Sequence, residues 1–523
     1  MPARAMRRPP LPIDPTVGVA RGSRGVVATG QAHATEAALD VLKEGGNAVD
    51  AAVAAALALA VVCPYATSLG GELFALVYDP QAKTTVGLNA TGRSPAATAP
   101  GTPPRNGPRS ATVPALVRGL DDLLTRYGSL PLARLIAPAI ALAGDGFAVH
   151  AILAENTRER TELLARDAGA SALFLPGGEP LREGATFVQS DLANVLDGIA
   201  SGGAGAFYAG ELADRFVAAC AAAGGEISAA DLAGHQSLWQ TPLGVPFYGH
   251  HVWTMPPNSY GPTLLLQLLD YEQLQIGTMD PGSPAFIDAG IEARRRAYAA
   301  AAPWIADPQL TETIAAAFIA GAVDRGHYDA PAAPAPPPRD RCTTNAIVVD
   351  QSGLAVSLVE SISAPFGAGV VAAGTGVLLN NRIAGFVRDP HHPNGIAPGK
   401  RPANTLAPCM VTRGGALAMA LGTPGTVGQT CTLAQFLARM LACGERAAEA
   451  AAAPRWSVDF EGRPIVEDTM DERLRAEVLA RHPDARVMRS GWISFGSIKL
   501  AAVTGTGYEG VADYRRAATT AGW

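Results

Sequence analysis

Residues 343–361 read TTNAIVVDQSGLAVSLVES and decide the fold class. Polar and apolar residues alternate in 343–350 and again in 354–361, as they do in strands, and the QSG between them fits a hairpin turn. The preceding residues 330–341 read APAAPAPPPRDR, in which five of twelve residues are proline. Such a segment can form neither a helix nor a central strand. We therefore predict an extended linker that leads directly into an antiparallel β-hairpin.

Outside this hairpin, blocks of strands alternate with helices. Helical patterns are present at 35–62 (interrupted at Gly45-Gly46), 117–142, 192–199, 212–223, 263–274, 286–302 and 432–441. Strand patterns occur at 25–29, 73–78, 84–88, 377–379 and 417–421. Strands in blocks, together with an antiparallel hairpin, favour a layered α+β fold over a doubly wound parallel sheet.

The composition is that of a globular protein. Of the 523 residues, 48% are hydrophobic and 17% are charged, and the net charge is −6. By length the chain could hold about two to four domains or one intertwined unit. Its basic residues do not cluster, which argues against nucleic acid or an anionic membrane as a partner.

The most apolar stretch, 51–62, is too short to span a bilayer, and no apolar run resembles a secretory signal. We expect a cytoplasmic protein.

Nothing in the sequence indicates a metal or a cofactor. The six cysteines form no CxxC pair, so we expect reduced and mostly buried thiols. His250-His251 and His391-His392 have no further residues at ligand spacing, which makes them surface turns rather than metal ligands. No strand is followed by GxGxxG, and there is no GxxxxGK[ST] to cradle a phosphate.

The junction between linker and hairpin could carry chemistry. If the peptide bond between Cys342 and Thr343 is cut, Thr343 gains a free α-amine beside its own hydroxyl. An α-amine has a pKa near ~8, so one residue would then supply both nucleophile and base. Two alternatives remain open: Thr343 simply begins a strand, or cutting occurs before Cys342 and exposes a cysteine nucleophile.

Several blocks, in order over roughly residues 25 to 515, resemble the γ-glutamyltransferase family of N-terminal-nucleophile hydrolases. They are residues 28–79, 113–149, 255–261 (MPPNSYG), 343–371, 397–408 (APGKRPANTLAP) and 421–429 (LGTPGTVGQ). The resemblance implies a four-layer αββα sandwich and a precursor that cuts itself before Thr343. It further implies a heterodimer of a large subunit, 1–342, and a small subunit, 343–523, which share one core and can pair again into a dimer.

The resemblance also assigns the catalytic roles. Thr343 matches the nucleophile, and Ser361 matches a hydroxyl residue that hydrogen-bonds it. Gly425 and Thr426 match a Gly-Gly pair whose N–H groups form the oxyanion hole. Two preorganised donors of this kind can each lower a barrier by about 3 kcal/mol, and a threonine N–H serves if its backbone conformation permits.

On the substrate side, Arg93 matches an arginine that binds the substrate carboxylate, for which its fork of donors is suited. Ser363 stands where transferases carry an asparagine near the substrate amino group. Asn404 and Thr405 replace a Ser-Ser pair that binds the carboxylate.

The departures from the family pattern concern charge. In true transferases an acid pairs with the substrate ammonium, but its position here is Gly385, and Arg382 stands where glutamine is usual. An ammonium would lose its counter-charge and meet a guanidinium. The pattern instead resembles the amidohydrolase-like branch, which includes oxamate amidohydrolases. Arg382 could alternatively form an ion pair with a neighbouring acid, and Glu72, which replaces a glycine of the family's GGGG-like loop, is a candidate pocket residue.

We therefore expect a self-processing threonine hydrolase that cleaves a small carboxylate-bearing amide through an acyl-enzyme. Three alternatives stand beside it. The chain could resemble homologues from lincomycin- and pyrrolobenzodiazepine-type pathways, which are associated with C–C bond cleavage, or it could be a true γ-glutamyltransferase or glutathione hydrolase. The third is an unprocessed protein that only binds a ligand.

Overall fold

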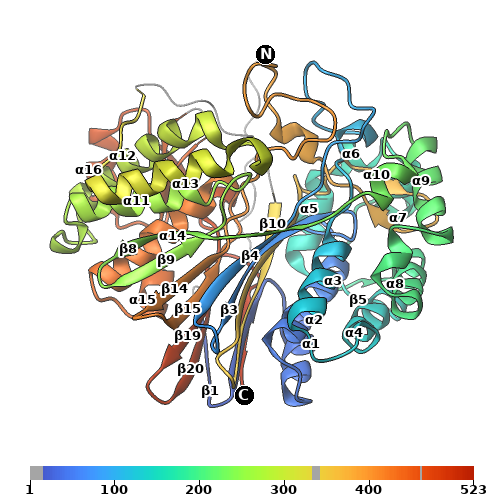
Figure 1. Ribbon diagram of the computed structural model, residues 1–523, viewed down its shortest axis with the longest axis horizontal. Helices are drawn as coiled ribbons and strands as arrows, with labels where there is room; N and C mark the ends of the chain where they lie inside the picture. Colours follow the sequence, from blue (N-terminus) through green and yellow to red (C-terminus); the bar gives the residue numbers. More distant parts are fainter. Residues whose placement is uncertain (1–15, 332–341, 460–461) are drawn as a thin grey trace.

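Two seven-stranded sheets lie face to face in the computed structural model, and helices cover the outer side of each (Figure 1). The model describes residues 16–331, 342–459 and 462–523; most of the linker at 330–341 thus lies outside the described residues. The arrangement is a four-layer αββα sandwich. It confirms the predicted α+β class.

The first sheet is built around the hairpin that opened the sequence analysis. Its strand order is β21-β2-β10-β11-β3-β4-β7. The strands are β21 (Thr519–Gly522), β2 (Gly25–Thr29), β10 (Cys342–Asp350), β11 (Ala355–Ser363), β3 (Glu72–Asp79), β4 (Thr84–Ala90) and β7 (Leu238–Gln240). Strands β10 and β11 are antiparallel, with Ala346 opposite Leu358. All residues of both are buried, as central strands must be.

The second sheet has the order β1-β20-β19-β15-β14-β9-β8. Its strands are β1 (Gly18–Gly22), β20 (Gly507–Ala512), β19 (Lys499–Thr504), β15 (Ala416–Gly422), β14 (Cys409–Arg413), β9 (His250–Thr254) and β8 (Leu243–Phe247). Of these only β15 was predicted. The two sheets meet through apolar side chains, among them Phe74, Ile347, Val359 and Met410.

The helices α1 (Ala32–Lys43) and α2 (Ala48–Val62) cover the first sheet and replace the interrupted pattern at 35–62. Every residue of α2 is buried, and Asn47 caps its N-terminus in a box with Asp50. The pattern at 117–142, predicted as one helix, is two: α3 (Leu116–Tyr127) and α4 (Leu132–Gly144). Pro131 explains the break, because a proline disfavours helical backbone in the residue before it.

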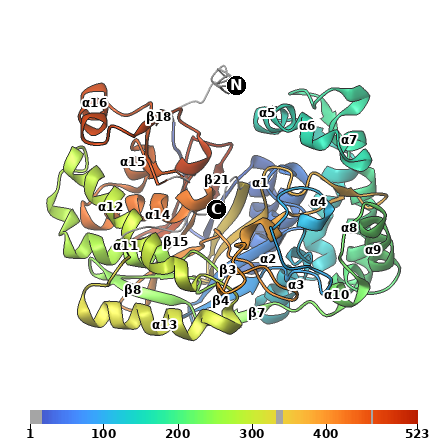
Figure 2. The same cartoon turned by 90° about the horizontal axis from the view of Figure 1, so that it is seen from above.

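The helices α11 (Pro262–Gln273), α12 (Pro284–Ala301), α13 (Pro308–Arg325) and α14 (Gln429–Leu437) lie over the second sheet, on the side opposite α1 and α2 (Figure 2). The remaining helices are α5 (Ala151–Glu159), α6 (Thr161–Leu164), α7 (Ala168–Phe174), α8 (Ser190–Gly202), α9 (Glu211–Ala222), α10 (Ala229–Ala233), α15 (Ala447–Ala452) and α16 (Glu472–Arg481). Small sheets are formed by β5 (Phe147–Ala148) with β6 (Thr186–Phe187), β12 (Val371–Ala372) with β13 (Val377–Leu378), and β16 (Trp456–Val458), β17 (Pro464–Glu467) and β18 (Arg486–Met488).

Both sheets combine strands from before and after residue 342. Strand β10 pairs with β2 on one side and with β11 on the other, and β1 pairs with β20. A cut at this point would therefore leave two fragments that share one core. Among the described residues, no helix is both long and apolar enough to cross a membrane.

Candidate active site

Thr343 lies at an irregularity at the start of β10. The register with β11 shifts between Cys342 and Thr344, so that Thr343 sits in a bulge between them. A bulge re-aims the side chain that it contains, which is why bulges are frequent beside active sites. Thr343 is 3% exposed in the continuous chain. The nucleophile candidate is thus buried within β10, the strand that Figure 1 labels between the two helical layers.

Ser361 contacts the peptide bond that precedes Thr343. Its Oγ donates to the carbonyl oxygen of Cys342 at 2.5 Å and accepts the N–H of Ser363 at 2.7 Å. The resemblance predicted a bond from Ser361 to the nucleophile itself; in the uncut chain the hydroxyl instead polarises the carbonyl that Thr343 would attack. Ser363 has a φ of +81° and faces Cys342 across the hairpin.

The loop after β15 supplies the candidate oxyanion hole. Gly425 has a φ of +136° and Thr426 a φ of +58°. A β-branched residue rarely adopts such a conformation, and backbone strain of this kind is concentrated at functional sites. Among the described residues, neither donates its N–H to a partner. Both N–H groups therefore remain available for a developing oxyanion.

Gln429 belongs to the site although sequence reasoning gave it no role. Its Nε2 donates to Thr343 Oγ1 at 3.4 Å, while its Oε1 accepts the N–H of Ala407 at 3.1 Å. The second bond fixes which end of the amide faces Thr343. The available signal was that Gln429 closes the block 421–429 and begins α14.

Arg93 contacts Gly399, a residue of the chain segment that follows Thr343. Its Nη1 donates to the carbonyl of Gly399 at 2.6 Å and lies 3.9 Å from Asp307 Oδ2. The side chain is 31% exposed. Arg93 is therefore partly exposed and shares its charge with Asp307, and its role in binding a carboxylate stays a prediction.

Arg382 forms an ion pair with Glu72, so the alternative left open for this arginine is the arrangement observed. Its Nε contacts Glu72 Oε1, and both side chains are 0% exposed. Glu72 also accepts Asn404 Nδ2 at 2.6 Å and the N–H of Gly92 at 3.3 Å. In the register of β11 and β3, Glu72 stands directly opposite Ser361. The pair therefore lies beside the hairpin that carries the nucleophile.

The guanidinium of Arg382 is only partly satisfied. Neither of its Nη groups has a hydrogen-bond partner within the described ranges. The hydroxyls of Thr405 and Thr426 are likewise buried and unpartnered there. Burial lowers the pKa of Arg382, whereas Glu72 opposes that shift. Because leaving buried donors unpaired is costly, the free Nη groups of Arg382 are able to bind a ligand oxygen or water.

One buried acid beside the nucleophile was not anticipated. Glu360 lies opposite Thr344 on β11, and burial raises its pKa well above the usual range. Desolvation at this buried position disfavours the charged form of its carboxyl group. Sequence gave no signal for it, since an isolated Glu in a strand reads as a surface residue.

The described residues contain no group of three or more metal-ligating side chains. All six cysteines are unpaired, and five of them are buried.

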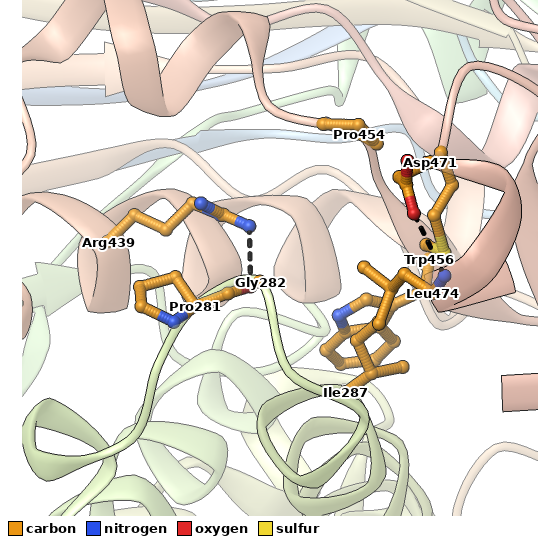
Figure 3. Close-up of a pocket in the computed structure, with 9 residues that line it drawn as sticks. Pro281, Gly282, Ile287, Arg439, Pro454, Trp456, Asp471 and Leu474 are labelled. Carbon is orange, nitrogen blue, oxygen red and sulfur yellow. Dashed lines mark hydrogen bonds between the residues drawn. The ribbon is translucent and has the colours of Figure 1, made fainter. Parts of the chain in front are cut away.

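A separate cavity of about 370 Å³ is shown in Figure 3, lined by Ile287, Trp456 and Leu474 among others. Two of its polar side chains have partners: Arg439 donates to the Pro281 carbonyl, and Asp471 accepts the N–H of Leu474. It shares no residue with the site around Thr343.

The family model described as Gamma-glutamyltranspeptidase matches residues 34–523. Oxamate amidohydrolase proenzyme of Klebsiella pneumoniae is 35% identical over 81% of this chain and 83% of that protein. Glutathione hydrolase proenzyme of Escherichia coli is 33% identical over 83% of this chain and 81% of its own length.

A solved structure shows the same likeness in three dimensions. The crystal structure of cephalosporin acylase from Bacillus halodurans has a TM-score of 0.86 at 27% identity, and the match covers 100% of this chain and 99% of that one. This chain is therefore an enzyme and belongs to the γ-glutamyltranspeptidase family of N-terminal-nucleophile hydrolases.

Proposed function

We propose that this protein is a precursor that cuts itself between Cys342 and Thr343 and then hydrolyses a small amide that bears a carboxylate. The observation that carries the proposal is the contact of Ser361 Oγ with the Cys342 carbonyl, 2.5 Å away, beside a threonine held in a bulge. A hydroxyl so placed stabilises negative charge on the carbonyl oxygen when Thr343 attacks.

In the first reaction, Thr343 Oγ adds to the carbonyl carbon of Cys342. The C–N bond breaks as its nitrogen takes up a proton, which leaves an ester to Thr343 Oγ and a free α-amine on Thr343. Water then hydrolyses the ester, and residues 1–342 end in a carboxylate at Cys342. The products are a large subunit, 1–342, and a small subunit, 343–523, which the shared sheets keep together as a heterodimer.

In the second reaction, the α-amine of Thr343 accepts the proton of the hydroxyl as it attacks the substrate carbonyl. We assign the N–H groups of Gly425 and Thr426 to stabilise the tetrahedral oxyanion, and Gln429, whose Nε2 donates to Thr343 Oγ1, to position the attacking oxygen. The leaving amine takes a proton, and an acyl-enzyme remains. Water then releases the acid and restores Thr343.

The charges of the site support a substrate without an amino group. The residue at 385 is a glycine, and Arg93 and Arg382 add two positive charges, offset by Asp307 and Glu72. Oxamate amidohydrolase and cephalosporin acylase are among the relatives. We favour a small acidic amide of the oxamate type over a γ-glutamyl compound such as glutathione.

The test begins with self-cleavage. Purified protein should give two bands of roughly 35 and 19 kDa, in proportion to the 342 and 181 residues of the 53.7 kDa chain. Thr343→Ala should remain one chain, because it lacks the attacking hydroxyl. Sequencing the small fragment must return Thr first; a start at Cys342 would contradict the assignment of the nucleophile.

Substrate class is tested on the processed enzyme. Oxamate and related acidic amides should be hydrolysed, and Thr343→Ala should lose that activity. Efficient turnover of γ-glutamyl-p-nitroanilide with no hydrolysis of acidic amides would overturn the substrate assignment while leaving self-cleavage intact.

A further inference from the structure

We propose that Glu72 and Arg382 together determine which acyl group the site accepts: Glu72 is an acid able to hold a substrate ammonium, and the Arg382 guanidinium occupies it as an internal substitute cation. This inference rests on the proposed hydrolase function and extends it to selectivity. It makes the exclusion of amino-bearing substrates a property of one buried ion pair.

Position supports this role. Glu72 lies opposite Ser361 in the β11–β3 register, and directly opposed side chains in antiparallel strands are about 4.5–5.5 Å apart at Cβ. Ser361 in turn contacts the Cys342 carbonyl. The carboxylate of Glu72 is therefore close to where an acyl group attached to Thr343 must lie.

The hydrogen bonds of Glu72 and Arg382 also support this role in selecting the acyl group. Asn404 Nδ2 and the N–H of Gly92 donate to Glu72, which fixes the carboxylate independently of Arg382. Arg382 by contrast is held to Glu72 through Nε, and its two Nη groups have no partner among the residues that the structure describes. The carboxylate is a preformed receptor, and the cation that fills it keeps two donors for a substrate oxygen.

The charges then predict selectivity. An ammonium brought to this position would compete with a fully buried guanidinium for the same carboxylate and would be repelled by it. A substrate oxygen, in contrast, can accept from the free Nη groups. The site should therefore prefer an acyl group with oxygen acceptors and no amine on this side.

Two substrates that differ only in the amine provide the measurement: γ-glutamyl-p-nitroanilide and glutaryl-p-nitroanilide. The readout is the ratio of their kcat/KM values in the processed enzyme. Arg382→Gln frees Glu72 and should raise the ratio at least about tenfold in favour of the amino-bearing substrate. Arg382→Lys keeps a cation and should not. The double variant Glu72→Gln/Arg382→Gln should lose the gain, because the acid is gone.

An unchanged ratio in folded Arg382→Gln would overturn the inference. Should Arg382→Gln fail to accumulate, Glu72→Gln supplies an independent test through binding alone. This variant leaves the Arg382 guanidinium without its counter-charge. Calorimetry should therefore show that glutarate binds the variant at least about tenfold more tightly than it binds the unaltered enzyme, whereas the affinity for glutamate should change little. Equal changes in the affinities for glutarate and glutamate would also overturn the inference. Because calorimetry needs no turnover, failure of the hydrolase proposal is separated from failure of this one.

Discussion

Two buried clusters of arginine and acid in this protein differ in how completely their donors are used. In the C-terminal cluster, Arg515 donates to Glu467 through Nε at 2.6 Å and Nη2 at 2.7 Å, and to Asp513 through Nη1 at 3.2 Å. Further bonds reach the carbonyls of Ala451 and Ala453. At the site, Arg382 has one acidic contact and two free Nη groups.

The difference separates a structural cluster from one prepared for a ligand. Buried charge is stable only when its desolvation is offset by pairing and hydrogen bonds. Arg455 also joins the C-terminal cluster through Asp513, so that each acid there meets more than one donor. The pair of Arg382 and Glu72 is fully buried, yet the Nη donors of Arg382 have no partner in the described part of the chain. A bound substrate oxygen can remove the free-energy cost of these unpaired donors.

The largest effect is expected for Arg515→Met. It removes every charge-assisted bond between Arg515 and its acids and leaves Glu467 and Asp513 buried with fewer partners. Breaking a buried pair from one side costs about 3–5 kcal/mol. Denaturant unfolding should show this loss. Arg515→Lys, which keeps the charge but not the fork, is the control and should lose less. A loss below about 1 kcal/mol in Arg515→Met would mean that the cluster does not hold the fold.

Arg382→Gln should cost less stability, about 1–3 kcal/mol, because Glu72 keeps its bonds from Asn404 and Gly92. Its kcat/KM for the acidic amide should nevertheless fall by about 30- to 1000-fold, since substrate loses a charge-assisted partner. The measurements are denaturant unfolding and steady-state kinetics on the same preparation. If Arg382→Gln is as unstable as Arg515→Met and its remaining folded fraction is fully active, the contrast between the two clusters fails.

The same contrast shows what sequence could predict. Thr343 and Ser361 lie on one hairpin, which local alternation and a QSG turn predicted. Ser363 lies two residues beyond the predicted strand and was assigned only through the family resemblance. Glu72 and Arg382 are far apart along the chain, and their pairing depends on how β3 and the turn at 382–385 meet. An isolated acid and an isolated arginine gave no pattern, so the pair stayed one of two alternatives.

The two sheets likewise differ in how well the sequence predicted their strands. The first sheet was largely predicted because β2, β3, β4, β10 and β11 carry apolar runs bounded by turn residues. The second sheet was mostly missed: β8 contains Pro246, and β14 and β19 contain polar residues within buried strands. Lys499 is an example, since a lysine at the start of a strand reads as exposed and is in fact 1% exposed. These strands are specified by packing rather than by local pattern.

Lys499 is a further buried cation, and it belongs to neither cluster. Burial lowers its pKa to about 7, and Arg516 acts in the same direction, while Asp513 and Cys63 oppose the shift. The oxygens of Asp513 already accept from Arg455 and Arg515. The unfolded chain therefore binds more protons than the folded one between pH 7 and about 10.5, and stability should rise with pH across that window.

Lys499→Met is the smallest of the three expected effects. The methionine needs no desolvated charge, so the variant should be more stable than the unaltered protein by about 1–2 kcal/mol at pH 7, after some loss of packing. The advantage should shrink as the pH rises toward 10, because the folded lysine is then neutral and the unfolded lysine approaches its own pKa of 10.5. Unfolding in denaturant at pH 7, 8, 9 and 10 measures the slope, and Lys499→Arg, whose charge persists, should be less stable at every pH. A Lys499→Met variant that is destabilised at pH 7, with an unchanged pH slope, would show that the ammonium has a partner in the folded protein and belongs with the satisfied cluster after all.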